Sequence, residues 1–282
     1  MEIREIIIFI MMCFVSYFLG GLSVARLITK KGKDGEIVNH GSGNPGTMNM
    51  LRTKGISLGL FTLLTDALKG VIPSLFGLLY FGNIVSDKMG YIALFTFGLI
   101  AVIGHIYPIY YKFKGGKGIA TTFGVFIVAD PISTIILFGV LFVTLYFIKI
   151  GSLVSLLFIM INAVVQLFRK DLEGNWIAKI VMWIMVILDI FAHRENLIRL
   201  IDNRENAADL QEGLKKDIDK LKHRREKKLE KHAEKKEKIS QKYQDKIDRK
   251  NEKLKRKLEQ ISVKIDENKE TKVSDTEIDS LQ

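Results

Sequence analysis

The sequence predicts an all-α, polytopic membrane protein with seven transmembrane helices and a charged, helical C-terminal tail. Hydrophobic residues make up 48% of the 282 residues, and most of them lie in long apolar runs before residue 192. Charged residues make up 26%, with a net charge of +11, and most of them follow residue 202. We therefore expect a membrane domain over residues 1–202 and a Lys/Glu-rich cytoplasmic tail over residues 203–282.

The first part of the chain contains three apolar runs, at residues 6–28, 56–81 and 89–106. Each is long enough to be a span, since about 20 apolar residues cross the hydrocarbon core of a membrane. The second run contains Asp66 and Lys69, which lie one helical turn apart. Ionisable side chains are costly inside a membrane, so these two residues are either a structural ion pair or catalytic.

The next apolar run, residues 119–148, is too long for one span. Asp130-Pro131 predicts a turn inside it, because proline disfavours a helical conformation at the residue before it. We expect the first half of this run to form a short or partly re-entrant helix. Two more runs follow, at residues 152–168 and 176–191.

The distribution of Lys and Arg predicts the orientation of these runs. The basic segments are residues 29–55, residues 110–118 and the tail after residue 193, and basic segments gather on the cytoplasmic side of a membrane. All three reach the same side only if residues 119–148 cross twice. This parity predicts seven spans, with the N-terminus outside and the tail inside.

A loop within residues 104–121 joins the third apolar run to the fourth. Its notable residues are His105, Lys112, Lys114, Gly115, Gly116, Lys117 and Gly118. Glycines let the backbone turn its N–H groups inward, lysines supply positive charge, and a helix N-terminus follows, so the loop suits a phosphate group. A Walker A loop is excluded, because Tyr111 stands where that motif needs its first glycine. The alternative is a glycine-rich turn with the lysines common on cytoplasmic loops.

The parity places two further polar segments on the same side as this loop. The first contains Gly41, Ser42, Gly43, Asn44, Gly46, Asn49 and Arg52. Its composition suits a backbone nest for an anion, and the alternative is an ordinary Gly/Pro/Asn loop. In the second, His193, Asn196 and Arg199 recur every third residue and so form one polar edge of a helix. The alternative there is a membrane-interface helix whose arginine extends into water.

The tail is polar and rich in Lys and Glu. Its Leu, Ile and Tyr residues recur at spacings of four, four and three, which favours a long helix or a weak coiled coil over disorder. Its charges are mixed rather than clustered, so we expect no nucleic-acid binding, and the sequence identifies no partner for it. The single cysteine, Cys13, lies in an apolar run, so neither a disulfide nor a metal cluster is predicted.

Together the three polar segments resemble the PlsY family, bacterial membrane glycerol-3-phosphate acyltransferases that use acyl phosphate as donor. The resemblance covers residues 5–205, and its most distinctive part is Gly104-His105, Pro108 and residues 113–118. Family members have a seven-helix membrane domain. By resemblance, the catalytic residues are Ser42, Lys114, His193 and Asn196. By resemblance, the substrate-binding residues are Gly41, Gly43, Asn44, Gly46, Asn49, Arg52, His105, Gly115, Gly116, Lys117, Gly118 and Arg199.

The resemblance implies acyl transfer from a fatty acyl phosphate to sn-glycerol 3-phosphate. The products are 1-acylglycerol 3-phosphate (lysophosphatidic acid) and phosphate, the first step of bacterial phospholipid synthesis, and no cofactor is implied. The implied partners are the two substrates, the lipid bilayer and an enzyme that produces acyl phosphate at the membrane. The implied location is the bacterial cytoplasmic membrane, with the active site and the tail on the cytoplasmic side.

Three places depart from the family pattern, and one of them, the segment at residues 149–155, matches it poorly. Thr47-Met48 stands where Ala-Thr is usual, and Ala192 stands where Arg usually precedes the histidine of the third segment. These departures leave open a second hypothesis, a divergent and weakly active paralogue that acts as a membrane scaffold through its tail. A third hypothesis, a transporter for a phosphorylated solute, is disfavoured because few polar residues lie along the spans. These are Asp66, Lys69, Asn162 and Asp189.

Overall fold

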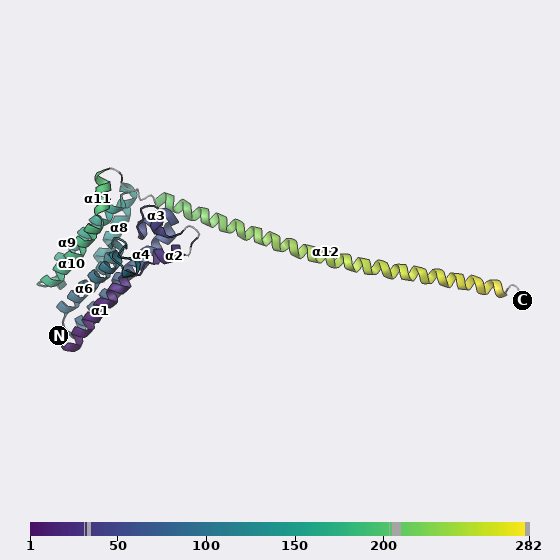
Figure 1. Ribbon diagram of the computed structural model, residues 1–282, viewed down its shortest axis with the longest axis horizontal. Coiled ribbons are helices and arrows are strands. Elements are labelled where there is room, and N and C mark those ends of the chain that lie inside the picture. The colour runs from purple at the N-terminus through teal and green to yellow at the C-terminus, as the bar shows by residue number, and fades with distance from the viewer. Residues whose placement is uncertain (31, 33–34, 203, 205–209, 280–282) are drawn as a thin grey trace. The chain divides into compact units, whose positions relative to one another are not determined.

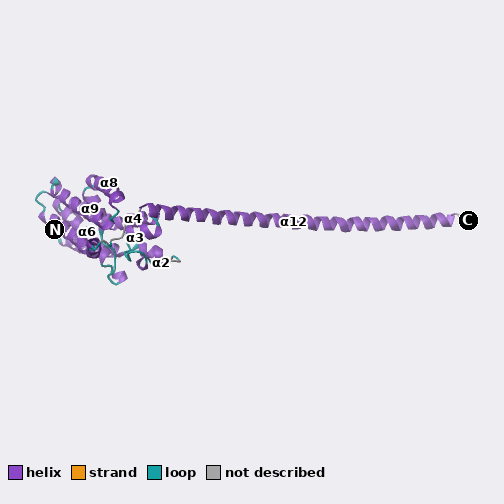
Figure 2. Ribbon diagram, turned by 90° about the horizontal axis from the view of Figure 1, so that it is seen from above, coloured by secondary structure: helices purple, strands orange, loops and turns teal. Residues whose placement is uncertain are grey.

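The computed structural model describes residues 1–30, 32, 35–202, 204 and 210–279, without the side chains of residues 210, 211 and 259–279. The described residues form helices joined by turns, with no strand among them (Figures 1 and 2). This confirms the all-α class. The chain divides into two compact units, Met1–Asp219 and Lys220–Gln282. We call the first of them the membrane unit.

Figure 1 shows the long helices of the membrane unit side by side, with α1 next to α6. In chain order its α-helices are α1 (Ile3–Gly21), α2 (Val24–Lys30), α3 (Thr47–Lys54), α4 (Ile56–Phe76), α5 (Gly82–Ile84), α6 (Asp87–Ile106), α7 (Ile119–Ala129), α8 (Pro131–Ile148), α9 (Gly151–Leu167), α10 (Trp176–Ala192) and α11 (Arg194–Ile201). A π-helical segment, η2 (Gly77–Phe81), joins α4 to α5. Three short 3₁₀ turns are η1 (Ile37–Asn39), η3 (Ile109–Tyr111) and η4 (Lys170–Leu172).

Four stretches of the described chain are long and apolar enough to cross a membrane, at Ile3–Lys30, Ile56–Ile84, Asp87–Tyr111 and Pro131–Ile148. A fifth is added if α10 and α11, which meet at 51°, are one broken span. Helices α7 and α9 are apolar but shorter. The 11 residues of α7 extend about 16 Å at 1.5 Å per residue, roughly half of the hydrocarbon thickness. The protein therefore crosses the membrane several times, and the count of seven spans stays a prediction.

The turn predicted at Asp130-Pro131 is confirmed. Helix α7 ends at Ala129, and α8 begins at Pro131 with the proline in its first turn. The Asp130 carboxylate accepts a hydrogen bond from the Ser133 amide at 3.2 Å, so Asp130 caps α8. The long apolar run is thus two helices, and its first half is the short one that the sequence predicts.

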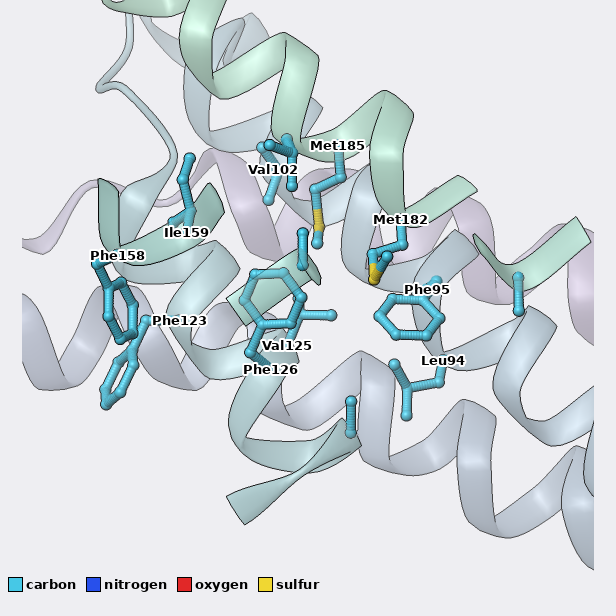
Figure 3. Close-up of a cluster of buried hydrophobic side chains, with 14 of the residues drawn as sticks. Leu94, Phe95, Val102, Phe123, Val125, Phe126, Phe158, Ile159, Met182 and Met185 are labelled. Carbon is cyan, nitrogen blue, oxygen red and sulfur yellow. The ribbon is translucent and has the colours of Figure 1, made fainter. Parts of the chain in front are cut away.

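The core of the membrane unit lies where α6, α7, α9 and α10 meet, and Figure 3 shows its centre. Phe95 comes from α6, Phe126 from α7, Ile159 from α9, and Met182 and Met185 from α10, and all five are completely buried. Lipid tails are as apolar as these side chains, so close packing rather than the hydrophobic effect holds the helices together. The same helices carry part of the site described below.

In the tail, α12 is a single helix, Leu210–Asp279 (Figure 2). Its first ten residues belong to the membrane unit, which ends at Asp219. Residue 203, where the predicted second domain begins, lies outside the described residues. The predicted domain boundary and the coiled coil therefore stay predictions.

Candidate active site

The three polar segments meet at one cavity of about 160 Å³ in the membrane unit. Nine of the predicted site residues line it: Ser42, Asn44, Gly46, Asn49, Arg52, His105, Lys117, His193 and Asn196. They come from the α3 region, the last turn of α6, the α6–α7 loop and the junction of α10 with α11. The structure therefore brings together residues that are up to about 150 positions apart in the chain.

Asn49 organises the first segment. Its Nδ2 donates to the carbonyl oxygens of His40 and Asn44, both at 2.9 Å, and its Oδ1 accepts from the Ser42 amide at 3.0 Å. Gly41 has a φ of +59°, and a Cβ there would lie 2.2 Å from Asn49 Oδ1. This network fixes the loop so that Ser42 and Asn44 line the cavity.

The glycine- and lysine-rich loop folds back on the end of α6. The Gly115 amide donates to the Ile106 carbonyl and the Gly116 amide to the His105 carbonyl, both at 3.0 Å. These two bonds hold the start of the loop, and Lys117 then reaches the cavity. Its Nζ donates to Asn196 Oδ1, which links the second segment to the third.

The third segment lies at the bend between α10 and α11. His193 is the residue between the two helices, and both it and Asn196 are buried. The His193 Nδ1 lies 2.8 Å from the Asp189 carbonyl oxygen. Because a carbonyl oxygen only accepts, this hydrogen bond places the proton on Nδ1.

Asp189 contacts the end of the glycine loop and the first turn of α7, a role that the sequence did not predict. Its Oδ2 accepts from Thr122 Oγ1 at 2.6 Å, and it is completely buried. Its Oδ1 lies so close to Gly118 that an added Cβ there would be 2.0 Å away. An acidic residue in an apolar run was the one signal in the sequence that marked Asp189. Its partner, Thr122, could not be predicted because it is 67 residues away in the sequence.

The membrane ion pair is adjacent to the cavity. Lys69 Nζ lies 2.5 Å from Asp66 Oδ1, and both side chains are buried. His105 Nδ1 lies 3.8 Å from the same Asp66 oxygen. Asp66 and His105 line the cavity, so the pair is structural in its contacts and also contributes a carboxylate to the wall of the site.

Most of the remaining cavity wall is apolar, although Thr47, Ser152 and Ser155 also line it. The apolar part consists of Leu60, Leu63, Ile119, Ala120, Phe123, Phe138, Leu141, Phe142, Leu145, Val154 and Phe158, among others. The rings of Phe123 and Phe138 are stacked, with centroids 4.3 Å apart. Met48, one of the departures from the family pattern, also lines the cavity and packs against the buried cluster of Leu145 and Val154. One cavity thus offers cationic and polar groups together with a surface that suits an alkyl chain.

The other predicted site residues do not line this cavity. They are Gly41, Gly43, Lys114, Gly115, Gly116, Gly118 and Arg199. Lys114 is exposed, and its carbonyl oxygen accepts from Arg26 at 2.7 Å. The substrate roles of all the predicted site residues stay predictions, whichever group they fall in.

Comparison with known proteins identifies the fold and the family. The family model for glycerol-3-phosphate acyltransferase matches residues 10–203. The glycerol-3-phosphate acyltransferase of Finegoldia magna is 34% identical over 200 residues, which are 70% of this chain and 94% of the relative. That of Halalkalibacterium halodurans is 38% identical over 192 residues, 68% of this chain and 91% of the relative.

Two crystal structures are also similar to this one. Both are of PlsY, described as an integral membrane glycerol 3-phosphate acyltransferase, one in a glycerol 3-phosphate form and one in a lysophosphatidic acid form. The first has a TM-score of 0.63 and 30% identity and covers 73% of this chain and 98% of PlsY. The second has a TM-score of 0.62 and 28% identity, with the same coverage. This chain belongs to the glycerol-3-phosphate acyltransferase family.

Proposed function

We infer that the protein transfers a fatty acyl group from acyl phosphate to sn-glycerol 3-phosphate. The products are 1-acylglycerol 3-phosphate and phosphate. The observation that carries this inference is the single cavity in which Arg52, Lys117 and His193 lie beside an apolar wall. Both substrates carry a phosphate and one carries an alkyl chain, so the cavity has the chemistry that this pair requires.

In this reaction the acceptor hydroxyl of glycerol 3-phosphate attacks the acyl carbon. The bond from the acyl carbon to the phosphate oxygen breaks, and the released phosphate takes up the proton of the hydroxyl. Acyl phosphate is already activated, so the enzyme needs no nucleophile of its own. Holding both substrates in line supplies much of the acceleration. Cations and N–H groups stabilise the leaving phosphate and the developing oxyanion.

The resemblance assigns the residues to the two substrates. Ser42, Arg52, Lys114, His193 and Asn196 bind glycerol 3-phosphate. The loop at residues 115–118 and the Asn44–Gly46 region bind acyl phosphate. Lys117, which donates to Asn196, stands at the boundary of the two groups. Lys114 has its role from the resemblance alone, because its side chain is exposed in the structure.

We place the protein in a bacterial cytoplasmic membrane with seven spans. Counting α7, α8 and α9 as separate spans brings all three basic segments to the cytoplasmic side. The active site and the tail then face the cytoplasm, where an enzyme that produces acyl phosphate would supply the donor. A weakly active scaffold is less favoured. Met48 lacks the hydroxyl of the threonine that is usual at this position in the family, but its side chain extends the apolar part of the cavity wall. The cationic residues of the cavity are retained.

Vesicles containing the full-length protein test this function. Given acyl phosphate and labelled glycerol 3-phosphate, the wild type should form labelled lysophosphatidic acid, and His193→Ala and Lys114→Ala should abolish it. Lys112→Ala is the matched control, because Lys112 is an exposed lysine of the same loop to which the resemblance assigns no role. Correctly inserted wild-type protein that forms no product contradicts the proposal.

A further inference from the structure

The first two turns of the tail pack against the joint between α3 and α4. The match to the acyltransferase family ends at residue 203, and α12 begins at Leu210, so this contact lies outside the family segment. It lies inside the membrane unit, which extends to Asp219. The contact is made by Gly213, Lys216 and Asp217. Lys216 and Asp217 follow Gly213 by three and four residues, so all three lie on one face of α12.

Asp217 caps the N-terminus of α4. Its Oδ2 accepts from both the amide and the hydroxyl of Ser57, each at 2.9 Å. Helix α4 begins at Ile56, directly after Gly55, which has no side chain with which to cap it. A carboxylate at this place satisfies a free N–H group and is attracted by the positive end of the helix dipole. Asp217, a residue of the tail, therefore caps α4 in place of the serine or aspartate that usually stands directly before a helix.

Lys216 and Gly213 hold the other side of the joint. Lys216 Nζ donates to the Arg52 carbonyl oxygen in the last turn of α3, where carbonyl groups lack helical partners. A Cβ added at Gly213 would lie 3.1 Å from Ile56 and 3.2 Å from Leu51. The tail helix therefore lies against the end of α3 and the start of α4 at once, with no room for a large side chain at position 213.

The joint itself is one residue long. Helix α3 ends at Lys54 and α4 begins at Ile56, so Gly55 alone sets the angle between them, with a φ of +99°. A Cβ at Gly55 would lie 2.2 Å from Asp217 Oδ1. Both helices line the cavity, α3 with Arg52 and α4 with Asp66 among others. The angle between α3 and α4 therefore sets the distance between Arg52 and Asp66 in the cavity wall.

We propose that Gly213, Lys216 and Asp217 form a clamp, supplied by the tail, that positions Arg52 and the α3 side of the cavity for acyl transfer. The clamp residues touch no substrate and act through α3, so they are positioning residues. The proposal rests on the proposed function. It gives the tail a role in the reaction, because the clamp is the first part of the same helix that continues to Asp279.

Steady-state kinetics of the full-length protein in vesicles test the clamp. Asp217→Ala should raise the KM for glycerol 3-phosphate about tenfold, because the binding-competent arrangement of α3 becomes a minor one. The KM for acyl phosphate should change less, because only the Asn44–Gly46 part of its site adjoins α3 and the loop at residues 115–118 follows α6. Asp217→Asn keeps an oxygen acceptor and should restore most of the affinity. Asp219→Ala is the matched control, because Asp219 is an exposed carboxylate one half-turn further along the same helix.

A second variant and a second measurement separate positioning from stability. Gly213→Leu keeps α12 helical but forces it away from Leu51 and Ile56, and it should reproduce the effect of Asp217→Ala on KM. Hydrogen–deuterium exchange should be faster over residues 47–60 in both variants and unchanged in Asp219→Ala. Wild-type kinetics in both variants overturn the clamp, even if exchange rises. An inactive wild type overturns the proposed function itself, and the clamp with it.

Discussion

Gly115→Ala should displace the glycine loop and inactivate the enzyme while the membrane unit remains folded. A Cβ at Gly115 would lie 2.0 Å from the His105 carbonyl oxygen and 2.7 Å from the Ile106 carbonyl oxygen. Both obstacles are backbone atoms of α6, which cannot rotate away as a side chain can. Ordinary contact begins at 3.4 Å, so the loop must move by 3.4 − 2.0 = 1.4 Å.

The cost of this displacement follows from the bonds that it breaks. The Gly115 and Gly116 amides donate to Ile106 and His105, and both bonds are lost when the loop moves. Two backbone hydrogen bonds contribute about 2 kcal/mol, and the overpacking adds about 1–3 kcal/mol. Lys117 follows directly in the chain and moves with the loop. A displacement of about 1 Å costs about 100-fold in rate, so kcat/KM should fall at least that far.

The assay is lysophosphatidic acid formation in vesicles, with detergent gel filtration to measure the folded fraction. Gly139→Ala is the matched control, because nothing lies within 4 Å of its Cβ position on α8. Gly116→Ala should fall between the two, since the three atoms nearest its Cβ position belong to the side chain of His105 and not to backbone. Gly115→Ala protein with wild-type kcat/KM, or with more activity than Gly116→Ala, refutes the reasoning.

Three further variants test the charges and the apolar wall. Lys117→Met removes the cation that contacts Asn196 and should lower kcat/KM about 100-fold with the thermal midpoint unchanged; full activity would remove Lys117 from the site. Lys69→Met strands the buried Asp66 carboxylate and should destabilise the protein by about 3 kcal/mol in thermal unfolding, with recovery in the Lys69→Met/Asp66→Leu double variant. Leu141→Phe narrows the apolar wall and should shift the preferred acyl phosphate to shorter chains by about tenfold, and an unchanged chain-length profile would place the acyl chain elsewhere.

Much of the fold follows from patterns that are local in the sequence. The apolar run at 176–191 became α10 (Trp176–Ala192), and the proline at 131 divided the long run as predicted. Helix α3 was not predicted, because residues 47–54 are polar and have no long apolar periodicity. It forms where Met50 and Leu51 are buried, a tertiary contact that no short window of sequence reveals.

The convergence of the three polar segments was predicted from charge parity, but the groups that hold them were not. Asp189 accepts a hydrogen bond from Thr122 and lies close to Gly118, although it belongs to a helix far along the chain, and Asp217 bonds Ser57 across 160 residues. A single sequence does not reveal such pairs, because the two residues have no fixed spacing and each can be explained by its own neighbours in the chain. In an apolar run Asp189 stands out only as a costly residue. Asp217 is one of many acidic residues in a charged tail.

Helix α7 shows how a helix about half as long as the hydrocarbon core is thick can still carry part of a rigid site. A Cβ at Gly124 would lie 2.0 Å from the Ala67 carbonyl oxygen, and one at Gly70 would lie 2.0 Å from the Thr121 carbonyl oxygen. The backbones of α4 and α7 are therefore in direct contact. This contact, rather than the thickness of the membrane, fixes the position of α7. Since the contact joins α7 to the helix that bears Asp66, the N-terminus of α7 and the carboxylate are fixed to each other. A larger residue at Gly124 would separate them and open the cavity between its polar and apolar walls.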